Sequence, residues 1–245
     1  MQSAVEAVNG SRNGTQQLLL ALRSGVVIEL NESLPVIEGF ALHLRGGAPL
    51  GATIDAQSRT RLFHVNNGIL RLEDVHLRNG HQVGTRSCYD QCTEGGAILL
   101  TSSSAAYLAG VTITNSTVLA EAISAGPSRG SPTVAGGALS LQGNSSATLI
   151  NCLIVNSSAI GSGEGCYGGA FHVYKSVLSL TRTDLVDSVV DDFSSRSLID
   201  PSRIIGGGAI FARESELYLE DCRIDNAVAR STYVTGGGGA RGGAF

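Results

Sequence analysis

A spacing of apolar residues before a polar marker recurs five times along the chain, and this repeat constrains the fold more than any other feature. In the stretch from Leu70 to Asn79, apolar residues stand nine, seven, four and two positions before Asn79. The same spacing precedes Asn115, Asn156, Asp187 and Asn226, with Thr183 as the only polar residue in those positions. Positions two apart indicate a strand with one buried face, and the three-residue step indicates a bend between two short strands.

A Gly-Gly-Ala element accompanies this spacing. It begins at Gly95, Gly136, Gly168, Gly207 and Gly242. From its second glycine to the next marker the distances are 19, 19, 18 and 18 residues, whereas from each marker to the next second glycine they are 17, 22, 13, 21 and 17. A nearly constant arc followed by a connector of variable length is typical of a solenoid, in which each coil stacks on its neighbour.

Another pair of apolar positions follows each Gly-Gly, two and four residues after its second glycine. These pairs are Ile98 and Leu100, Leu139 and Leu141, Phe171 and Val173, and Ile210 and Ala212. Phe63 and Val65 hold the same positions in an earlier coil, and Phe245 opens a later one. The pattern predicts a further strand per coil, aligned through five coils.

The glycines and the markers each have a physical reason. Two glycines before a strand permit positive φ or a close approach of two backbones where the connector enters the wall. Asparagine tolerates the left-handed conformation, and stacked coils would bring such side chains within about 4.8 Å, giving a ladder of amide hydrogen bonds. We therefore predict a structural ladder, not a binding site, at Asn79, Asn115, Asn156, Asp187 and Asn226.

The start of the chain has a different character. Residues 1–14 are polar and lack the basic and apolar regions of a secretory signal. Thr15 to Leu22 predicts a short helix, with Thr15 as N-cap and Ser24-Gly25 as its end. We expect residues 1–25 to form an N-terminal segment with a helix capping the first coil, and residues 26–245 to form the repeats.

Composition and charge exclude several classes of protein. The net charge of −4 and pI near 5.7 argue against a nucleic-acid-binding face. No uninterrupted apolar run reaches the roughly 18 residues of a membrane span. With aromatic residues at 5% and no tryptophan, the core is expected to consist of stacked aliphatic side chains. No cofactor is predicted.

The order Phe63, Val65, Leu70, Leu72, Val75, Leu77, Asn79, followed by Gly-Gly-Ala-Ile units, resembles the parallel β-helix of the pectin-lyase-like superfamily. The repeated Gly-Gly-Ala with its later asparagine is similar to the repeats of chlamydial polymorphic outer-membrane proteins. The resemblance covers roughly residues 26–245. It implies an all-β, right-handed, single-stranded parallel β-helix of about six coils. Such proteins are often adhesins or surface stalks, and the superfamily also contains polysaccharide lyases and glycoside hydrolases.

Three functions follow as hypotheses. The first is a non-enzymatic cell-surface or extracellular module that binds a polysaccharide or a cell-surface protein through its outer walls and through the connectors 115–136 and 187–206. The second is a polysaccharide lyase or glycoside hydrolase, whose low-ranked catalytic candidates are Asp184, Asp187, Asp191 and Asp192, because glycoside hydrolysis needs two carboxylates about 5 to 9.5 Å apart. The third is a purely structural spacer.

The cysteines and histidines add weaker indications. Cys152 and Cys222 take the inward position four residues before a marker, too far apart to form a bridge. A Cys88–Cys92 disulfide is feasible, and free thiols are the alternative. His64 and His172 occupy equivalent outward positions three coils apart, so no metal site is predicted from them.

The last residues, GGGGARGGAF, open a coil and then stop. An uncapped stack exposes strand edges and apolar core. We expect the chain to be part of a longer solenoid, truncated at its C-terminus. End-to-end association through this last coil is the alternative.

Overall fold

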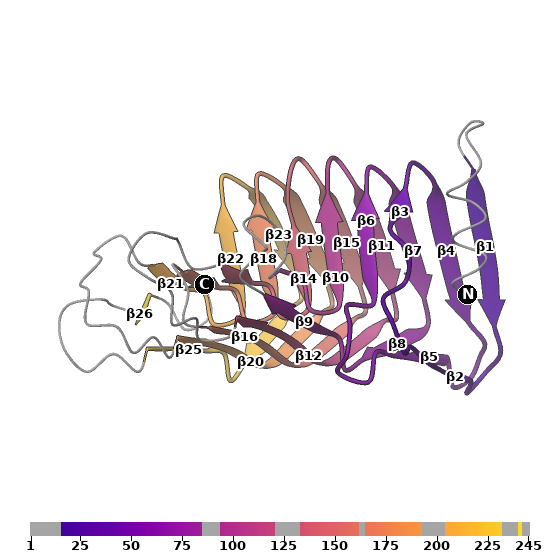
Figure 1. Ribbon diagram of the computed structural model, residues 1–245, viewed down its shortest axis with the longest axis horizontal. Coiled ribbons are helices and arrows are strands. Elements are labelled where there is room, and N and C mark those ends of the chain that lie inside the picture. Colours follow the sequence, from indigo (N-terminus) through magenta and orange to yellow (C-terminus); the bar gives the residue numbers. More distant parts are fainter. Residues whose placement is uncertain are drawn as a thin grey trace.

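The computed structural model describes residues 16–84, 94–120, 133–161, 165–192, 204–231 and 240–241, with side chains outside the description at 192, 204, 205, 231, 240 and 241. The described residues form β-strands and contain no helix. All pairings between these strands are parallel, and the strands assemble into four sheets, here named A to D (Figure 1). The all-β class is therefore confirmed, and the arrangement is consistent with a β-solenoid.

Sheets A and C each contain one strand from successive repeats, and sheet A begins one repeat earlier, with β1. Sheet A comprises, in spatial order, β1 (Gln17–Leu22), β4 (Ala41–Gly46), β7 (Ile69–Glu73), β11 (Ala105–Ala109), β15 (Ser146–Ile150), β19 (Val177–Thr181) and β23 (Glu216–Glu220). Sheet C comprises β3 (Ile37–Glu38), β6 (Phe63–Asn66), β10 (Ile98–Thr101), β14 (Leu139–Leu141), β18 (Phe171–Tyr174) and β22 (Ile210–Arg213). Spatial order follows chain order in both, so successive repeats lie side by side.

Sheet B continues each repeat, and sheet D adds a strand to the later ones. Sheet B comprises β2 (Val27–Glu29), β5 (Ala52–Asp55), β8 (Val75–Arg78), β12 (Thr112–Ala120), β16 (Leu153–Gly161), β20 (Asp184–Asp192) and β24 (Arg223–Asp225), with β9 (His81–Gly84) beside β12 and β25 (Val228–Ser231) beside β20. Sheet D comprises β13 (Val134–Ala135), β17 (Gly165–Tyr167), β21 (Ile204–Gly206) and β26 (Ala240–Arg241). In the described strands from β10 onward, the chain thus visits C, A, B and D before it returns to C, whereas the earlier repeats pass from sheet B to sheet C.

The register of the sheets follows the spacing found in the sequence. In sheet C, Phe63 lies opposite Ile98, which lies opposite Leu139. In sheet A, Leu72 lies opposite Leu108, which lies opposite Leu149. Equivalent positions of successive repeats therefore form columns one strand spacing apart, as the predicted alignment of the coils requires.

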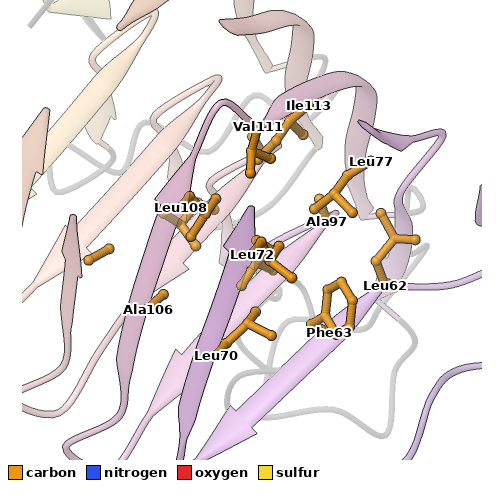
Figure 2. Packing of buried hydrophobic residues seen from close by; sticks show 14 of the residues in the cluster. Leu62, Phe63, Leu70, Leu72, Leu77, Ala97, Ala106, Leu108, Val111 and Ile113 are labelled. Atoms are coloured by element: carbon orange, nitrogen blue, oxygen red, sulfur yellow. The ribbon is translucent and has the colours of Figure 1, made fainter. Parts of the chain in front are cut away.

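The inward columns form the main core. Leu70, Leu72, Val75 and Leu77 have no exposed surface, and the equivalent residues of the next two repeats are at most 5% exposed. Figure 2 shows Phe63 and Leu72 pointing into the same interior as Leu108 of the next repeat. A smaller second cluster, formed by Val118, Ala120, Val134, Ala159, Cys166 and Val190, lies between the later part of sheet B and sheet D.

Each repeat turns at three residues in the left-handed conformation, standing twelve and five positions before the marker and at the marker itself. The set is Asn67, Asp74, Asn79, Ser103, Gly110, Asn115, Asn144, Asn151, Asn156, Lys175, Arg182, Asp187, Glu214, Asp221 and Asn226, with φ between 48° and 62°. The bend predicted between the two strands before each marker is therefore confirmed, because the second turning position separates sheet A from sheet B.

The two glycines of the repeated element have different roles. Gly136, the first, has φ +64°, and its equivalents in the neighbouring repeats are also left-handed. Gly137, the second, lies so close to the next repeat that an added Cβ would collide with the carbonyl oxygen of Gly169 and lie 2.5 Å from Ser158 N. Any side chain there would push apart the backbones entering sheet C.

The predicted N-terminal helix is wrong. Gln17 to Leu22 form strand β1, which pairs with β4 along its whole length, Leu18 opposite Leu42 and Leu20 opposite Leu44. Alternate leucines therefore extend the buried face of sheet A, and this pairing outweighs the helix preference of glutamine and leucine. Thr15, the predicted N-cap, lies outside the described residues. The repeats begin before residue 26, and sheet A has seven strands.

A search of the described residues for helices long and apolar enough to cross a membrane finds none.

Candidate functional site

The marker side chains are hydrogen-bonded between coils. Asn156 Nδ2 donates to Asn115 Oδ1 at 2.8 Å, and Asn115 Nδ2 donates to Asn79 Oδ1 at 3.4 Å. Asn79 Nδ2 in turn donates to Asp55 Oδ1 at 2.8 Å, so a buried carboxylate ends the row. Burial alone would raise the pKa of Asp55, but the hydrogen bonds from Asn79, the Gln57 amide and Arg78 together hold it below its ordinary value.

A second, shorter row lies in the following coils, where Asn226 Nδ2 donates to Asp187 Oδ1 at 3.0 Å. Asp187 lies between Asn156 and Asn226 in the stack. An ionised carboxylate has no hydrogen to donate, so it cannot continue the row toward Asn156. The marker side chains therefore hydrogen-bond to one another and are not arranged around a ligand.

A serine row, which the sequence analysis missed, supports the bend between sheets C and A. Ser145 Oγ accepts the backbone N–H of Ser104 at 3.2 Å, and Ser176 Oγ accepts that of Ser145 at 3.2 Å. Ser215 Oγ accepts the backbone N–H of Ser176 at the same distance. All four serines stand eleven residues before their marker, so the spacing itself carried the signal.

The carboxylate candidates follow one another along a single strand. Asp184, Asp187 and Asp191 lie along the single strand β20, and the side chain of Asp192 lies outside the described residues. At about 3.3 Å per residue, Asp184 and Asp191 are on the order of 15 Å apart even with the bend at Asp187. For the pair Asp184 and Asp191, this exceeds the separation needed to flank one glycosidic bond, about 5 to 9.5 Å.

A buried polar cluster lies on the outer face of sheet C. Glu94 Oε2 accepts a hydrogen bond from Ser140 Oγ at 2.7 Å and another from Gln142 Nε2, and it lies 3.5 Å from His172 Nδ1. The Tyr167 ring, 6.0 Å from that of His172, and the Phe211 ring, 5.9 Å from it, lie 4.4 Å from each other on one side of the histidine. Glu94, Ser140 and His172 are the residue types of a serine-hydrolase triad. The spacing of the sequence did not show that these three side chains meet.

The geometry of this cluster is not that of a nucleophile. Ser140 Oγ lies 3.1 Å from His172 Nδ1, the same nitrogen that faces Glu94, whereas a triad uses opposite nitrogens of the imidazole for its serine and its carboxylate. Ser140 also has no exposed surface. Burial alone would raise the pKa of Glu94, but the hydrogen bond and charge of His172, with the hydrogen bonds from Ser140 and Gln142, hold it below its ordinary value. We interpret the cluster as a structural one, in which hydrogen bonds to the Glu94 carboxylate join successive repeats.

The outer face of sheet A carries several exposed apolar side chains, and sheet B exposes Val27 and Leu153. Leu19, Ile69, Val177 and Tyr218 lie on it, between 36% and 61% exposed. Tyr107 lies on the same face, with Arg71 Cζ 5.4 Å from its ring centre.

Polar side chains share this face with the apolar ones. Glu73 Oε1 lies 3.2 Å from His43 Nε2, and Glu73 Oε2 lies 3.8 Å from Arg45 Nε. Thr148 and Ser179 stand beyond Tyr107 in the same column. The face therefore combines apolar platforms with hydrogen-bonding groups.

A cavity of about 470 Å³ opens beside this face, at the bend between sheets C and A. Its lining includes Gln17, Phe40, Asn67, Ile69 and Ser103. Ile69 belongs both to the cavity and to the outer face of sheet A, so the two are continuous.

The remaining candidates lie apart from this region. Cys88 and Cys92 fall outside the described residues, whereas Cys152 and Cys222 are free and separated in the stack by Thr183. His64 and His172 share a column of sheet C, with Leu99 and Ser140 between them. Burial, and then the charge of Arg61, lower the pKa of His64 to about 4. Within the described ranges no three histidine, cysteine or carboxylate side chains gather as metal ligands would.

No family model, curated protein or solved structure matches the chain. Its function must be inferred from the geometry just described.

Proposed function

We propose that the chain is a right-handed parallel β-helix that serves as a non-enzymatic, extracellular binding module, with a polysaccharide lying along the outer face of sheet A. Parallel order in all sheets and the regular return of the chain to sheet C support the β-helix. Its right hand follows from the strong preference of parallel crossovers for that hand.

The observation that carries the binding proposal is the gathering of Leu19, Ile69, Tyr107, Val177 and Tyr218 on one outer face. Tyrosine offers an apolar ring face and a hydroxyl, the combination that suits a sugar ring with its C–H and O–H groups. Tyr107 and Tyr218 share one column, and three strand spacings of about 4.8 Å place them about 14 Å apart. A ligand contacting both must be extended, which favours a polymer.

Hydrolysis or elimination has less support. The three described carboxylate candidates lie along one strand, and Asp187 already accepts a hydrogen bond from Asn226. Glu94, the most buried carboxylate partner of a histidine, contacts a serine without exposed surface. Neither observation favours two carboxylates placed around an accessible sugar bond.

The test is retention of the purified chain on immobilised neutral and acidic polysaccharides, with released reducing and unsaturated ends measured in the same samples. Tyr107→Ala and Tyr218→Ala should each weaken retention about tenfold, equivalent to roughly 1.4 kcal/mol. Tyr174→Ala, which removes a tyrosine from sheet C, is the matched control and should leave retention unchanged. Release of sugar ends would refute the non-enzymatic proposal, and equal losses in all three variants would refute the role of sheet A.

A further inference from the structure

The cavity at the bend between sheets C and A is lined without any charged side chain. Gln17 and Asn67 contribute amides, Ser103 contributes a hydroxyl, and Ile69 and Phe40 contribute apolar surface. Gln17, Asn67, Ile69 and Ser103 are solvent-exposed, so their polar atoms are accessible to a ligand entering from outside.

The backbone holds these side chains in fixed places. Asn67 and Ser103 are left-handed turning residues of successive coils, with φ of 50° and 61°. The Asn67 N–H donates to Thr101 O at 3.2 Å, and the Ser103 N–H donates to Gly143 O at 2.7 Å. Because the turns are tied to the next coil in this way, the cavity is pre-formed, which lowers the entropic cost of binding.

The size and chemistry of the cavity limit its occupant. A volume of about 470 Å³ falls within the usual range for small-molecule sites, roughly 300 to 1,000 Å³. An anionic ligand that enters the cavity would lose its hydration without gaining a cationic partner from the lining. A cationic ligand would likewise gain no carboxylate partner, so binding of either charged ligand is unfavourable. Amide and hydroxyl groups around an apolar floor match an uncharged molecule that carries many hydroxyls on an apolar ring.

We propose that this cavity binds an uncharged sugar unit of the polysaccharide, so that the site discriminates against uronic acids. The inference rests on the proposed function and names its ligand class. Ile69 joins the cavity to the outer face of sheet A, so a polymer with one unit in the cavity continues along the column of Tyr107 and Tyr218.

The experiment is calorimetric titration of the full chain with cellotetraose, maltotetraose and tetragalacturonate, accompanied by backbone amide NMR spectra. At least one neutral tetrasaccharide should bind at least tenfold more tightly than tetragalacturonate and shift the amide signals of Gly68 and Ile69. Gln17→Ala and Ile69→Ala should each weaken that binding about tenfold. Leu153→Ala, which removes a side chain that is 38% exposed on sheet B, is the matched control and should leave it unchanged.

Several outcomes would overturn the inference. Equal affinity for tetragalacturonate, an unaltered affinity in both cavity variants, preference for a neutral peptide over all three sugars, or no binding would each refute it. If polysaccharide retention still depends on Tyr218 while the cavity variants bind normally, the cavity inference fails and the proposed function stands. Tetrasaccharide binding in the cavity without polysaccharide retention refutes the proposed function and keeps the cavity as a sugar site.

Discussion

Replacing Asn115 tests how much the marker side chains stabilise the stack. Asn115 has φ +53°, donates to Asn79 and accepts from Asn156. Asn115→Ala removes both hydrogen bonds, each worth about 0.5 to 1.5 kcal/mol, with the lower end expected because the residue is exposed. It also forces an alanine into the left-handed region, at a cost of about 1 to 2 kcal/mol.

The expected loss in the free energy of unfolding is therefore about 2 to 4 kcal/mol, measured by equilibrium unfolding in urea. Asn115→Gly loses the same hydrogen bonds but accepts positive φ, so its loss should be about 1 kcal/mol smaller. These two substitutions at one position separate the backbone contribution from that of the ladder.

Asn144 supplies the matched control. It is also exposed and left-handed, with φ +62°, and its side chain makes no hydrogen bond within the described part of the chain. Asn144→Ala should therefore cost only the backbone term, about 1 to 2 kcal/mol. Equal losses for Asn115→Ala and Asn144→Ala would show that the ladder adds no stability. Equal losses for Asn115→Ala and Asn115→Gly would refute the backbone reasoning.

Three further changes should alter stability in predictable directions. Because the pKa of Glu94 is lowered in the folded state, the ionised carboxylate stabilises the fold at pH values above its unfolded-state pKa near 4.5. This stabilisation is lost as the pH falls through the folded-state pKa. Glu94→Gln should therefore lower the melting temperature at pH 7, and its difference from the parent should narrow below pH 4.5; a constant difference contradicts this. Ser157→Ala should stabilise by about 1 kcal/mol in urea unfolding, because the buried Oγ has no partner among the described residues and Ala227 holds the equivalent place; destabilisation would indicate a bound water. Asp187→Asn should stabilise by about 0.5 kcal/mol in the same assay by supplying a donor to Asn156, and a loss would refute that continuity.

The sequence predicted the parts of the fold that depend on repeated packing. The inward positions before each marker and the glycine pairs recur because every coil meets the same neighbours, so five repeats of one pattern specify one register. The helix prediction for residues 15–22 failed because short-range preference favoured helix, whereas Leu18 and Leu20 pair with β4. The alternating leucines correctly indicated a strand. This short segment has no marker residue, however, so it could not be aligned with the other repeats.

The candidate sites were less predictable because they join residues from different positions of the repeat. Ser140 and His172 hold equivalent positions in successive repeats, whereas Glu94 stands directly before its glycine pair, at a different position of the repeat. The cavity likewise depends on β1, the strand that the sequence analysis misassigned.

The contrast between inner and outer columns bears on function. The inward column through Leu44, Leu72, Leu108, Leu149 and Leu180 is leucine throughout. The adjacent outward column of the same strands contains His43, Arg71, Tyr107, Thr148, Ser179 and Tyr218. Solubility requires only polar residues at the outward positions, and the half-buried Tyr107 and exposed Tyr218 exceed that requirement. The chemical variety of this column is what a wall requires when it recognises different units of an extended ligand, so its substitution should change binding while leaving the leucine core and the fold intact.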